Sequence, residues 1–195
     1  MKRGLILIAA SGLALGGCVS FGGKVPESLL TLSADMERPV GSDGTAAKGA
    51  TLVVLPPATP QMLVTDRVVV RTSDTAIAYL ADARWSDVPA RLFSDLLSEV
   101  IAARTGRSVL DRRQFGLAPG ARLTGRLNAF ELNTSKHSVV ISYDAALTQG
   151  DGQPMRTRRF EAESPTASEK PEAVARALNE AANRLAVEVA DWVGK

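Results

Sequence analysis

The sequence predicts an α/β fold in a single domain, with an antiparallel or mixed β-sheet and two long amphipathic helices packed on one side. Two segments, around residues 88–105 and 171–193, repeat apolar residues at helical spacing. Other segments, above all 121–132 and 139–147, alternate apolar and polar residues with the period of two that a half-buried strand requires. The chain of 195 residues is long enough for one domain with a sizeable core.

The first 17 residues are interpreted as an export signal. Lys2 and Arg3 precede an apolar run from Gly4 to Leu15, and a basic segment followed by such a run is typical of a signal peptide. The run is too short for a transmembrane helix, which needs about 20 residues to cross roughly 30 Å of hydrocarbon. Residues 1–17 are therefore left out of the predicted fold.

Cys18 is the predicted lipidation site. Leu15-Gly16-Gly17-Cys18 has the order of a lipobox, and Cys18 is the only cysteine in the chain. An unpaired thiol in an exported protein is unusual unless it is modified, and two or more acyl chains anchor a protein stably. Residues 18–49 are then a lipidated tether, interrupted at residues 28–32 by a short strand that returns to the domain of residues 50–195.

The chain without its signal peptide is electrically neutral. The first 17 residues contain two of the 23 Lys and Arg and none of the 21 Asp and Glu, which leaves 21 residues of each sign. Without a basic stripe, the sequence has no electrostatic footprint for a nucleic acid or for a polybasic membrane contact. We therefore expect no nucleic-acid partner.

The domain is predicted to open with three strands. Residues 51–55 are a short β-rich run without alternation, which indicates a strand buried on both faces. Residues 66–71 and 75–80 flank the turn-forming Thr72-Ser73-Asp74 and predict a hairpin.

The first helix follows this hairpin. Ser86 and Asp87 are its candidate N-caps, Pro89 fits its first turn, and Gly106 follows its last residue. Its apolar face is formed by Val88, Leu92, Phe93, Leu96, Leu97, Val100 and Ile101.

Three further strands and a helix complete the domain. The strand at 121–132 changes phase, which predicts a bulge near Ala129-Phe130. The strand at 139–147 leads through a Gly-Asp-Gly turn to a last strand at about 155–163. The final helix, 171–193, is expected to be capped by Ser168 or Glu169. Its apolar stripe is Val174, Leu178, Ala181, Leu185, Val189 and Trp192.

No residue pattern predicts catalysis. His137 is the only histidine and lies in an expected turn, where a solvated side chain is a simpler interpretation than a general base. One histidine and one lipidated cysteine cannot supply a typical zinc ligand set, and no Gly-rich phosphate loop follows a predicted strand. We therefore expect no enzyme, no metal and no cofactor.

Arg156, Arg158 and Arg159 form the densest basic cluster and are the candidate partner-docking residues. The simpler interpretation is a solvated edge strand, whose charges discourage pairing with other strands. The alternative is a docking face for an acidic partner or for lipid head groups. Trp85 and Trp192 are expected to be core residues, because each flanks an apolar helical stripe.

Several segments match the pattern of a known family, the strongest being Ala83–Pro89. They are the lipobox at Cys18, Leu29–Leu32, Asp66–Val70, Ala76–Leu80, Ala83–Pro89, Leu123–Glu131 and Ala190–Trp192. In these segments the chain resembles the ABC-type transport auxiliary lipoproteins, which include the Pqi-type intermembrane transport lipoprotein. Two departures lie near the tether: the family often has a tyrosine in its first strand and a longer apolar strand before Pro56-Pro57.

The resemblance implies a non-catalytic lipoprotein that serves an Mce-type system for phospholipid transport between membranes. The other parts of such a system are an Mce-domain protein, an ABC permease and an ATPase. The lipoprotein holds or receives the periplasmic end of this transporter. Val19 follows the lipidated cysteine where aspartate would signal retention in the inner membrane. We therefore expect the periplasmic face of the outer membrane, with the inner membrane as the alternative. A homo-oligomer is compatible with this role.

Two other classes stay open at this point. An assembly or chaperone lipoprotein for an outer-membrane β-barrel or a lipopolysaccharide component has a similar sheet and two helices. A periplasmic solute-binding lipoprotein fits less well, because the mature chain is short for two lobes that close on a ligand. Neighbouring genes for an Mce protein and an ABC permease would favour the transport role.

Overall fold

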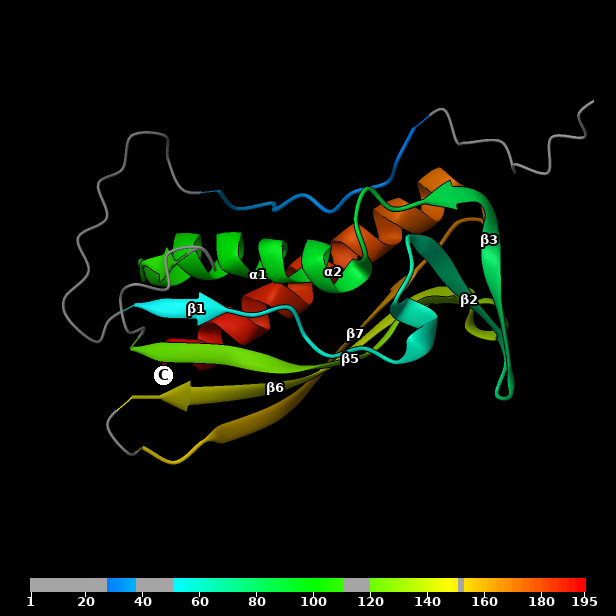
Figure 1. The fold of residues 1–195 in the computed structure, drawn as a ribbon. Helices are drawn as coiled ribbons and strands as arrows, with labels where there is room; N and C mark the ends of the chain where they lie inside the picture. The colour runs from blue at the N-terminus through cyan, green and yellow to red at the C-terminus, as the bar shows by residue number, and fades with distance from the viewer. Residues whose placement is uncertain (1–27, 38–50, 111–119, 151–152) are drawn as a thin grey trace, which may run out of the picture.

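The sheet is built around one long strand, β5 (Ala121–Asn133), in a computed structural model that describes residues 28–37, 51–110, 120–150 and 153–195 (Figure 1). β6 (Ser138–Gln149) pairs antiparallel along one edge of β5. The other edge of β5 pairs with two parallel strands in succession, β1 (Leu52–Val54) near its start and β2 (Arg67–Ser73) near its end.

Three outer strands complete this sheet. β3 (Ala76–Arg84) lies beside β2, β4 (Val109–Leu110) beside β1, and β7 (Arg156–Pro165) beside β6. Within the described residues the sheet therefore has seven strands of mixed direction. Among the strands that the structure describes, β7 pairs with β6 only, so the arginine-rich strand lies at an edge, as predicted.

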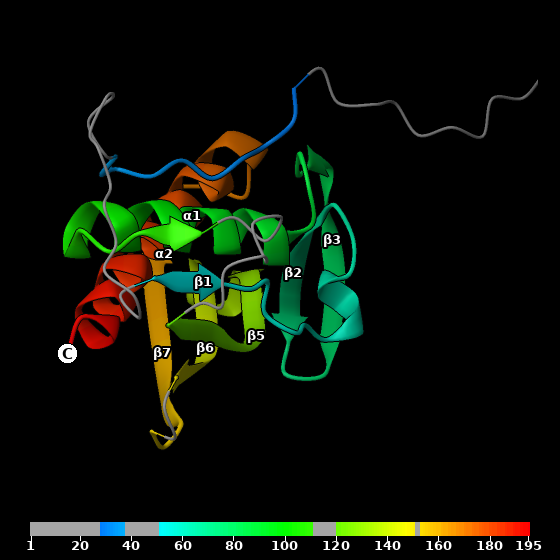
Figure 2. The same cartoon turned by 60° about the vertical axis from the view of Figure 1, so that its left-hand side comes forward.

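Both long helices, α1 (Pro89–Thr105) and α2 (Pro171–Val193), pack on the same face of the sheet (Figures 1 and 2). This arrangement confirms the predicted α/β class. All residues of the predicted α2 stripe are buried, and so are the predicted α1 face residues other than Val88 and Leu92. On the opposite face, β5 and β6 carry polar side chains that include Arg122, Ser142 and Asp144.

Aromatic pairs join the layers along the length of the core. The ring centroids of Trp85 and Phe130 lie 5.5 Å apart, and those of Phe160 and Trp192 lie 5.7 Å apart. Both pairs meet edge to face, the arrangement that aromatic quadrupoles favour. Trp85 and Trp192 are 2% and 7% exposed, which confirms that both are core residues.

The predicted helix caps are wrong at both N-termini. The N-cap residues are Val88 and Lys170, and neither makes a side-chain capping hydrogen bond. A proline follows each of them at the first helical position, and proline forces the preceding residue into an extended conformation. In each helix the N-cap therefore lies after the residues that were predicted to cap it. Gly106 follows the last residue of α1, as predicted, and it adopts the left-handed conformation.

The predicted strand boundaries need small corrections. The hairpin turn lies at Asp74-Thr75, because β2 continues through Ser73. The bulge in β5 lies between Leu127 and Ala129, slightly earlier than predicted. The expected strand at residues 28–32 is reduced to a single bridge, formed by Leu30.

Candidate docking surface

The tether joins the body beside the start of α1. The amide N of Leu30 donates to the carbonyl O of Arg84, and the amide N of Ser86 donates to the carbonyl O of Leu30, both at 2.8 Å. Leu30 thereby pairs in parallel with Trp85. The part of the tether that joins the body is thus held against a buried core residue.

From this point the chain runs over the two helices as an extended strap, residues 31–37 (Figure 1). Two α2 asparagines hold its backbone: the amide N atoms of Ser33 and Asp35 donate to Oδ1 of Asn179 and Asn183, both at 2.9 Å. Asn183, 5% exposed, also donates from Nδ2 to the carbonyl O of Ser33 at 2.8 Å. Sequence reasoning missed this strap. The predicted lipidation site, Cys18, lies outside the described residues.

The arginine cluster of β7 is divided between the two faces of the sheet. Arg156 and Arg158 lie on the helix side, because alternate residues of a strand share a face. Arg156 donates from Nη2 to the carbonyl O of Trp192 at 3.1 Å, and its guanidinium lies 5.0 Å from the Trp192 ring centroid. The Arg158 guanidinium lies 4.8 Å from the centroid of Phe160. Among the described residues Arg158 forms no ion pair.

Arg159 lies on the open face and forms an ion pair with Asp144. Its Nη2 donates to Oδ2 of Asp144 at 2.9 Å, and Nδ2 of Asn128 donates to the same oxygen at 2.7 Å. The hydrogen bonds from Arg159 and then Asn128 lower the pKa of Asp144 to about 2. Arg156 and Arg159 thus have polar partners within the protein, whereas Arg158 contacts the Phe160 ring and forms no ion pair among the described residues.

This pair predicts a measurable acid dependence of stability. A carboxyl whose pKa is lowered by folding stabilises the fold above its unfolded pKa, about 4, and loses that contribution as the pH falls through about 2. Because the pair is exposed, we expect a contribution of no more than about 1 kcal/mol. Urea melts between pH 5 and pH 2 should show a shallower loss of stability in Asp144→Asn than in wild type. If the free energy of unfolding falls equally with pH in both proteins, the prediction is wrong.

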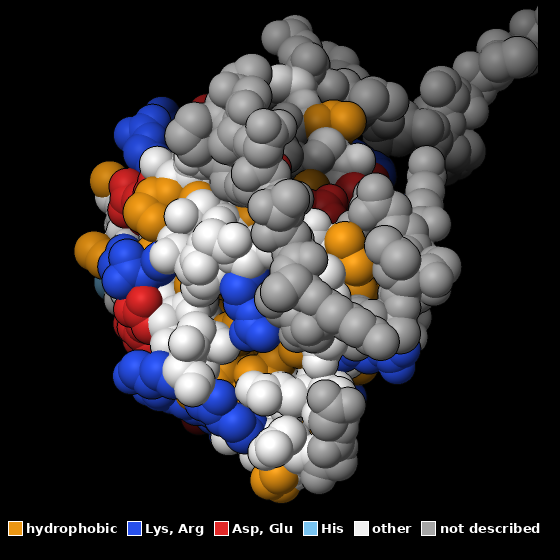
Figure 3. Space-filling model, turned by 90° about the vertical axis from the view of Figure 1, so that its left-hand side faces the viewer, with side chains coloured by type: hydrophobic (Ala, Val, Ile, Leu, Met, Phe, Trp, Pro, Cys, Tyr) orange, Lys and Arg blue, Asp and Glu red, His pale blue; other side chains and the backbone are white. Residues whose placement is uncertain are grey.

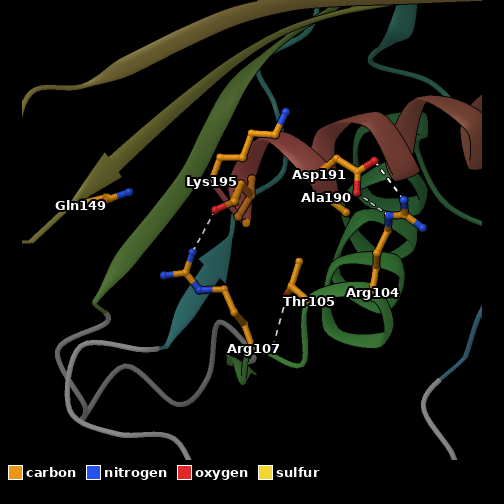
Figure 4. A pocket seen from close by; sticks show the side chains of 9 residues that line it. Arg104, Thr105, Arg107, Gln149, Ala190, Asp191 and Lys195 are labelled. Carbon is orange, nitrogen blue, oxygen red and sulfur yellow. Dashed lines mark hydrogen bonds and ion pairs between the residues drawn. The ribbon is translucent and has the colours of Figure 1, made fainter.

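A pocket of about 560 Å³ lies between the C-terminal ends of both helices and the end of β6 (Figure 4). On one side Nη2 of Arg104 donates to Oδ2 of Asp191 at 3.0 Å, a hydrogen-bonded pair that lowers the pKa of Asp191. On the other side Nη1 of Arg107 donates to the carbonyl O of Val193 at 3.1 Å. Lys195 also lines the pocket and is exposed.

Basic side chains gather at this end of the molecule, which we call the basic end (Figure 3). Here α1 and α2 end, β5 begins and β6 ends. Its basic residues are Arg104, Arg107, Arg122, Arg126, Arg156, Arg158, Arg159 and Lys195. Asp144 and Asp191 lie among them and are each paired with an arginine, and the carboxylates of Glu161 and Glu188 lie nearby on β7 and α2. Among the described residues, basic side chains therefore outnumber carboxylates at this end.

His137 is exposed, as predicted, in the turn that joins β5 to β6. Its φ of 49° places it in the left-handed region. In the described part of the chain, no group of three or more His, Cys, Asp or Glu side chains is arranged to hold a metal ion. None of the helices in that part is both long and apolar enough to span a membrane.

Known structures share this fold. Protein XCC0632 from Xanthomonas campestris, which carries the DUF330 family model, is 17% identical, with a TM-score of 0.67 over 85% of this chain and 94% of that chain. The crystal structure of an uncharacterised protein is 20% identical, with a TM-score of 0.63 over 76% and 94% of the two chains. No curated protein matches the sequence. At these identities the two likenesses show the fold alone.

The family follows from the sequence itself. Residues 30–190 match the pattern of the ABC-type transport auxiliary lipoprotein components. The match runs from Leu30, where the tether joins the body, almost to the end of α2, and so includes every described strand. The chain therefore belongs to the family of ABC-type transport auxiliary lipoprotein components.

Proposed function

We propose that this protein is a non-catalytic component of an Mce/ABC-type phospholipid transport system that docks the periplasmic part of the transporter at the membrane. The observation that carries the proposal is the placement of two features at opposite ends of the body. The tether joins at the start of α1, and the basic end lies where α1 and α2 finish. A protein built in this way links a membrane on one side to a charged partner on the other.

Family membership supports the connection with a transporter, and the neutral but polarised charge distribution supports docking. Complementary charges mainly raise association rates and fix orientation. In this proposal the three β7 arginines contribute to the docking surface, and Arg158 contributes most because its guanidinium forms no ion pair among the described residues. The periplasmic face of the outer membrane is the proposed location.

The docking role predicts that reversing these charges weakens association with the Mce-domain partner. Changing Arg156, Arg158 and Arg159 together to Glu should reduce capture of the partner at least tenfold at low salt. Arg158→Glu alone should reduce it several-fold without a change in thermal stability, because an exposed charge contributes only about 0–1 kcal/mol to folding. Pull-downs over a salt series, with thermal melts of each variant, measure both effects.

A second variant tests the absence of catalysis. His137→Asn keeps a residue that tolerates the left-handed region and should leave lipid transport unchanged. Loss of transport in a normally folded His137→Asn protein would reveal an active site. If the Arg158→Glu and triple variants capture the partner as well as wild type does, the docking role is wrong. The arginines are then only solvated charges on an edge strand.

A further inference from the structure

We propose that the outer edge of β3, from Ala76 to Ala81, binds an extended segment of a partner protein in which apolar residues are flanked by basic ones. This edge lies beside β2, which pairs with the end of β5, and so lies away from the basic end (Figures 1 and 2). The inference therefore goes beyond the proposed docking function and does not depend on it.

The two long edge strands, β3 and β7, differ in their protection against pairing. Charged side chains and proline usually keep an edge strand from pairing with another chain. The stretch Ala76–Ala81 of β3 has neither and consists of alanine, isoleucine, tyrosine and leucine. The protective residues of β7 are Arg156, Arg158, Arg159, Glu161, Glu163 and Pro165. The β3 edge therefore lacks the features that keep an edge strand unpaired.

The backbone of this stretch is open on its outer side. Among the described residues, Ala76–Ala81 hydrogen-bonds with β2 only. Farther along the chain, the outer side already holds another segment, because Leu30 pairs in parallel with Trp85. A short extended segment can therefore add to this edge by backbone hydrogen bonds, the mode of binding known as β-strand addition.

Side chains on both faces of the edge are available to an added strand. Ile77, which is 44% exposed, and Tyr79 lie on the open face of the sheet. The Arg67 guanidinium lies 4.2 Å from the centroid of the Tyr79 ring and covers part of it. Ala76 and Ala78 are exposed on the other face. Because aromatic and β-branched residues pair favourably across strands, an added strand with valine or isoleucine suits this edge.

Two carboxylates flank the apolar stretch and favour a partner with basic ends. Asp74 lies in the hairpin turn, and Asp82 lies in a bulge with a φ of 53°. Both are exposed, and neither forms an ion pair among the described residues. Arg71, which interacts electrostatically with Asp74, is already hydrogen-bonded to Glu131. The ends of the edge are therefore negative.

These carboxylates disfavour the other occupants of an apolar edge. If two copies paired antiparallel about Ala78, Asp74 of each copy would face Asp82 of the other, and like charges directly opposite destabilise a sheet. An anionic lipid surface would also be repelled by them. A separate chain with basic residues on both sides of an apolar segment fits the charges and the open backbone together.

A labelled peptide with the sequence Lys-Val-Thr-Val-Thr-Val-Lys, blocked at both ends, tests the proposal against the lipidated protein in micelles of a non-ionic detergent. Fluorescence anisotropy should show binding that weakens as salt rises, and at least fivefold weaker binding when both lysines are replaced by Glu. N-methylation of one of the two alternate sets of peptide amides should abolish binding, because only one edge of the peptide can pair with β3. If both methylated peptides bind as well as the unmodified peptide, the proposal is wrong.

Ile77→Lys should weaken peptide binding at least fivefold, because it removes an apolar contact and charges the edge. Its side chain is exposed, so thermal melts should be unchanged. Met155→Lys is the matched control: it makes the same kind of change at a side chain that is 60% exposed just before β7, and it should change affinity less than twofold. Asp82→Asn keeps a residue that tolerates the left-handed region and should reduce the preference for the lysine peptide over the Glu peptide at least twofold.

Two results would assign the edge to a different occupant and so overturn the proposal. One is sedimentation equilibrium that shows a dimer which Ile77→Lys abolishes, without binding of the peptide. The other is binding of the Cys18→Ser protein to vesicles of phosphatidylethanolamine and phosphatidylglycerol, lost on addition of Ile77→Lys, again without binding of the peptide. Equal peptide affinity of wild type and Ile77→Lys would overturn it as well.

Discussion

Replacing Gly125 with alanine should destabilise the domain by about 3 kcal/mol or more, enough to unfold much of a marginally stable protein. Gly125 lies in the middle of β5 with a φ of +153°, a conformation that side chains rarely adopt. An added Cβ would lie 2.0 Å from the carbonyl O of Asp144 and 2.7 Å from the ring of Tyr143. The first contact is with backbone, so no rotamer change can relieve it.

The buried ring of Tyr143 explains why the strand needs glycine here. Its hydroxyl donates to the carbonyl O of Thr124 at 2.7 Å, and its ring meets Phe93 of α1 edge to face at 5.2 Å. The ring can reach both partners only because Gly125 leaves space beside them. Burial also raises the pKa of the Tyr143 hydroxyl, which keeps it protonated as a donor.

Gly106→Ala is the control for this prediction. Gly106 also has a positive φ, +68°, but an added Cβ would meet nothing within 4 Å. We expect it to cost only about 1 kcal/mol, the penalty of the left-handed conformation itself. Urea denaturation of both variants separates steric conflict from backbone preference. Equal losses of stability would show that the contacts at Gly125 are not decisive.

Periodicity alone predicted the elements that bury a continuous face. The helix predicted over 171–193 is α2 with the same bounds, because its apolar stripe repeats for the whole length of the helix. The alternation in the strand at 139–147 is equally regular and lies within β6. Such patterns are local, so one sequence suffices to find them.

Features that join distant segments could not be predicted in this way. The pairing of both β1 and β2 with one edge of β5 depends on strand order, which alternation does not encode. Glu131, 3% exposed, is an example: its hydrogen bonds with Arg71 join β5 to β2. A carboxylate in a strand gives no sign in the sequence of which cation it will meet.

In the candidate site, too, the sequence shows which residues cluster locally but not which distant residues they contact. The density of Arg156, Arg158 and Arg159 was visible in the sequence, but the partners of Arg156 and Arg159 come from α2 and β6. The pocket joins residues after α1 to the end of α2. Asn183 was the one signal for the strap, because it is a polar residue next to the apolar stripe of α2.

Cys18→Ser should release the protein from the membrane and abolish its part in transport. Acyl chains contribute about 0.8 kcal/mol per buried methylene, so losing two or more chains removes many kcal/mol of membrane affinity. The expected product is an unlipidated precursor without palmitate, absent from detergent-extracted membranes. Incorporation of radiolabelled palmitate into this variant would contradict the assignment of Cys18.

The folded body should survive this substitution, because Leu30 and the strap are held by the body's own hydrogen bonds. Val19→Asp provides the matched variant: it keeps the cysteine and the acyl chains but introduces the residue that signals inner-membrane retention. Density-gradient fractionation should place wild type with the outer membrane and Val19→Asp with the inner membrane. Wild type found with inner-membrane markers would overturn the proposed location. Loss of transport by Val19→Asp, with lipidation intact, would then show that the body must be attached to the correct membrane for its basic end to reach the partner.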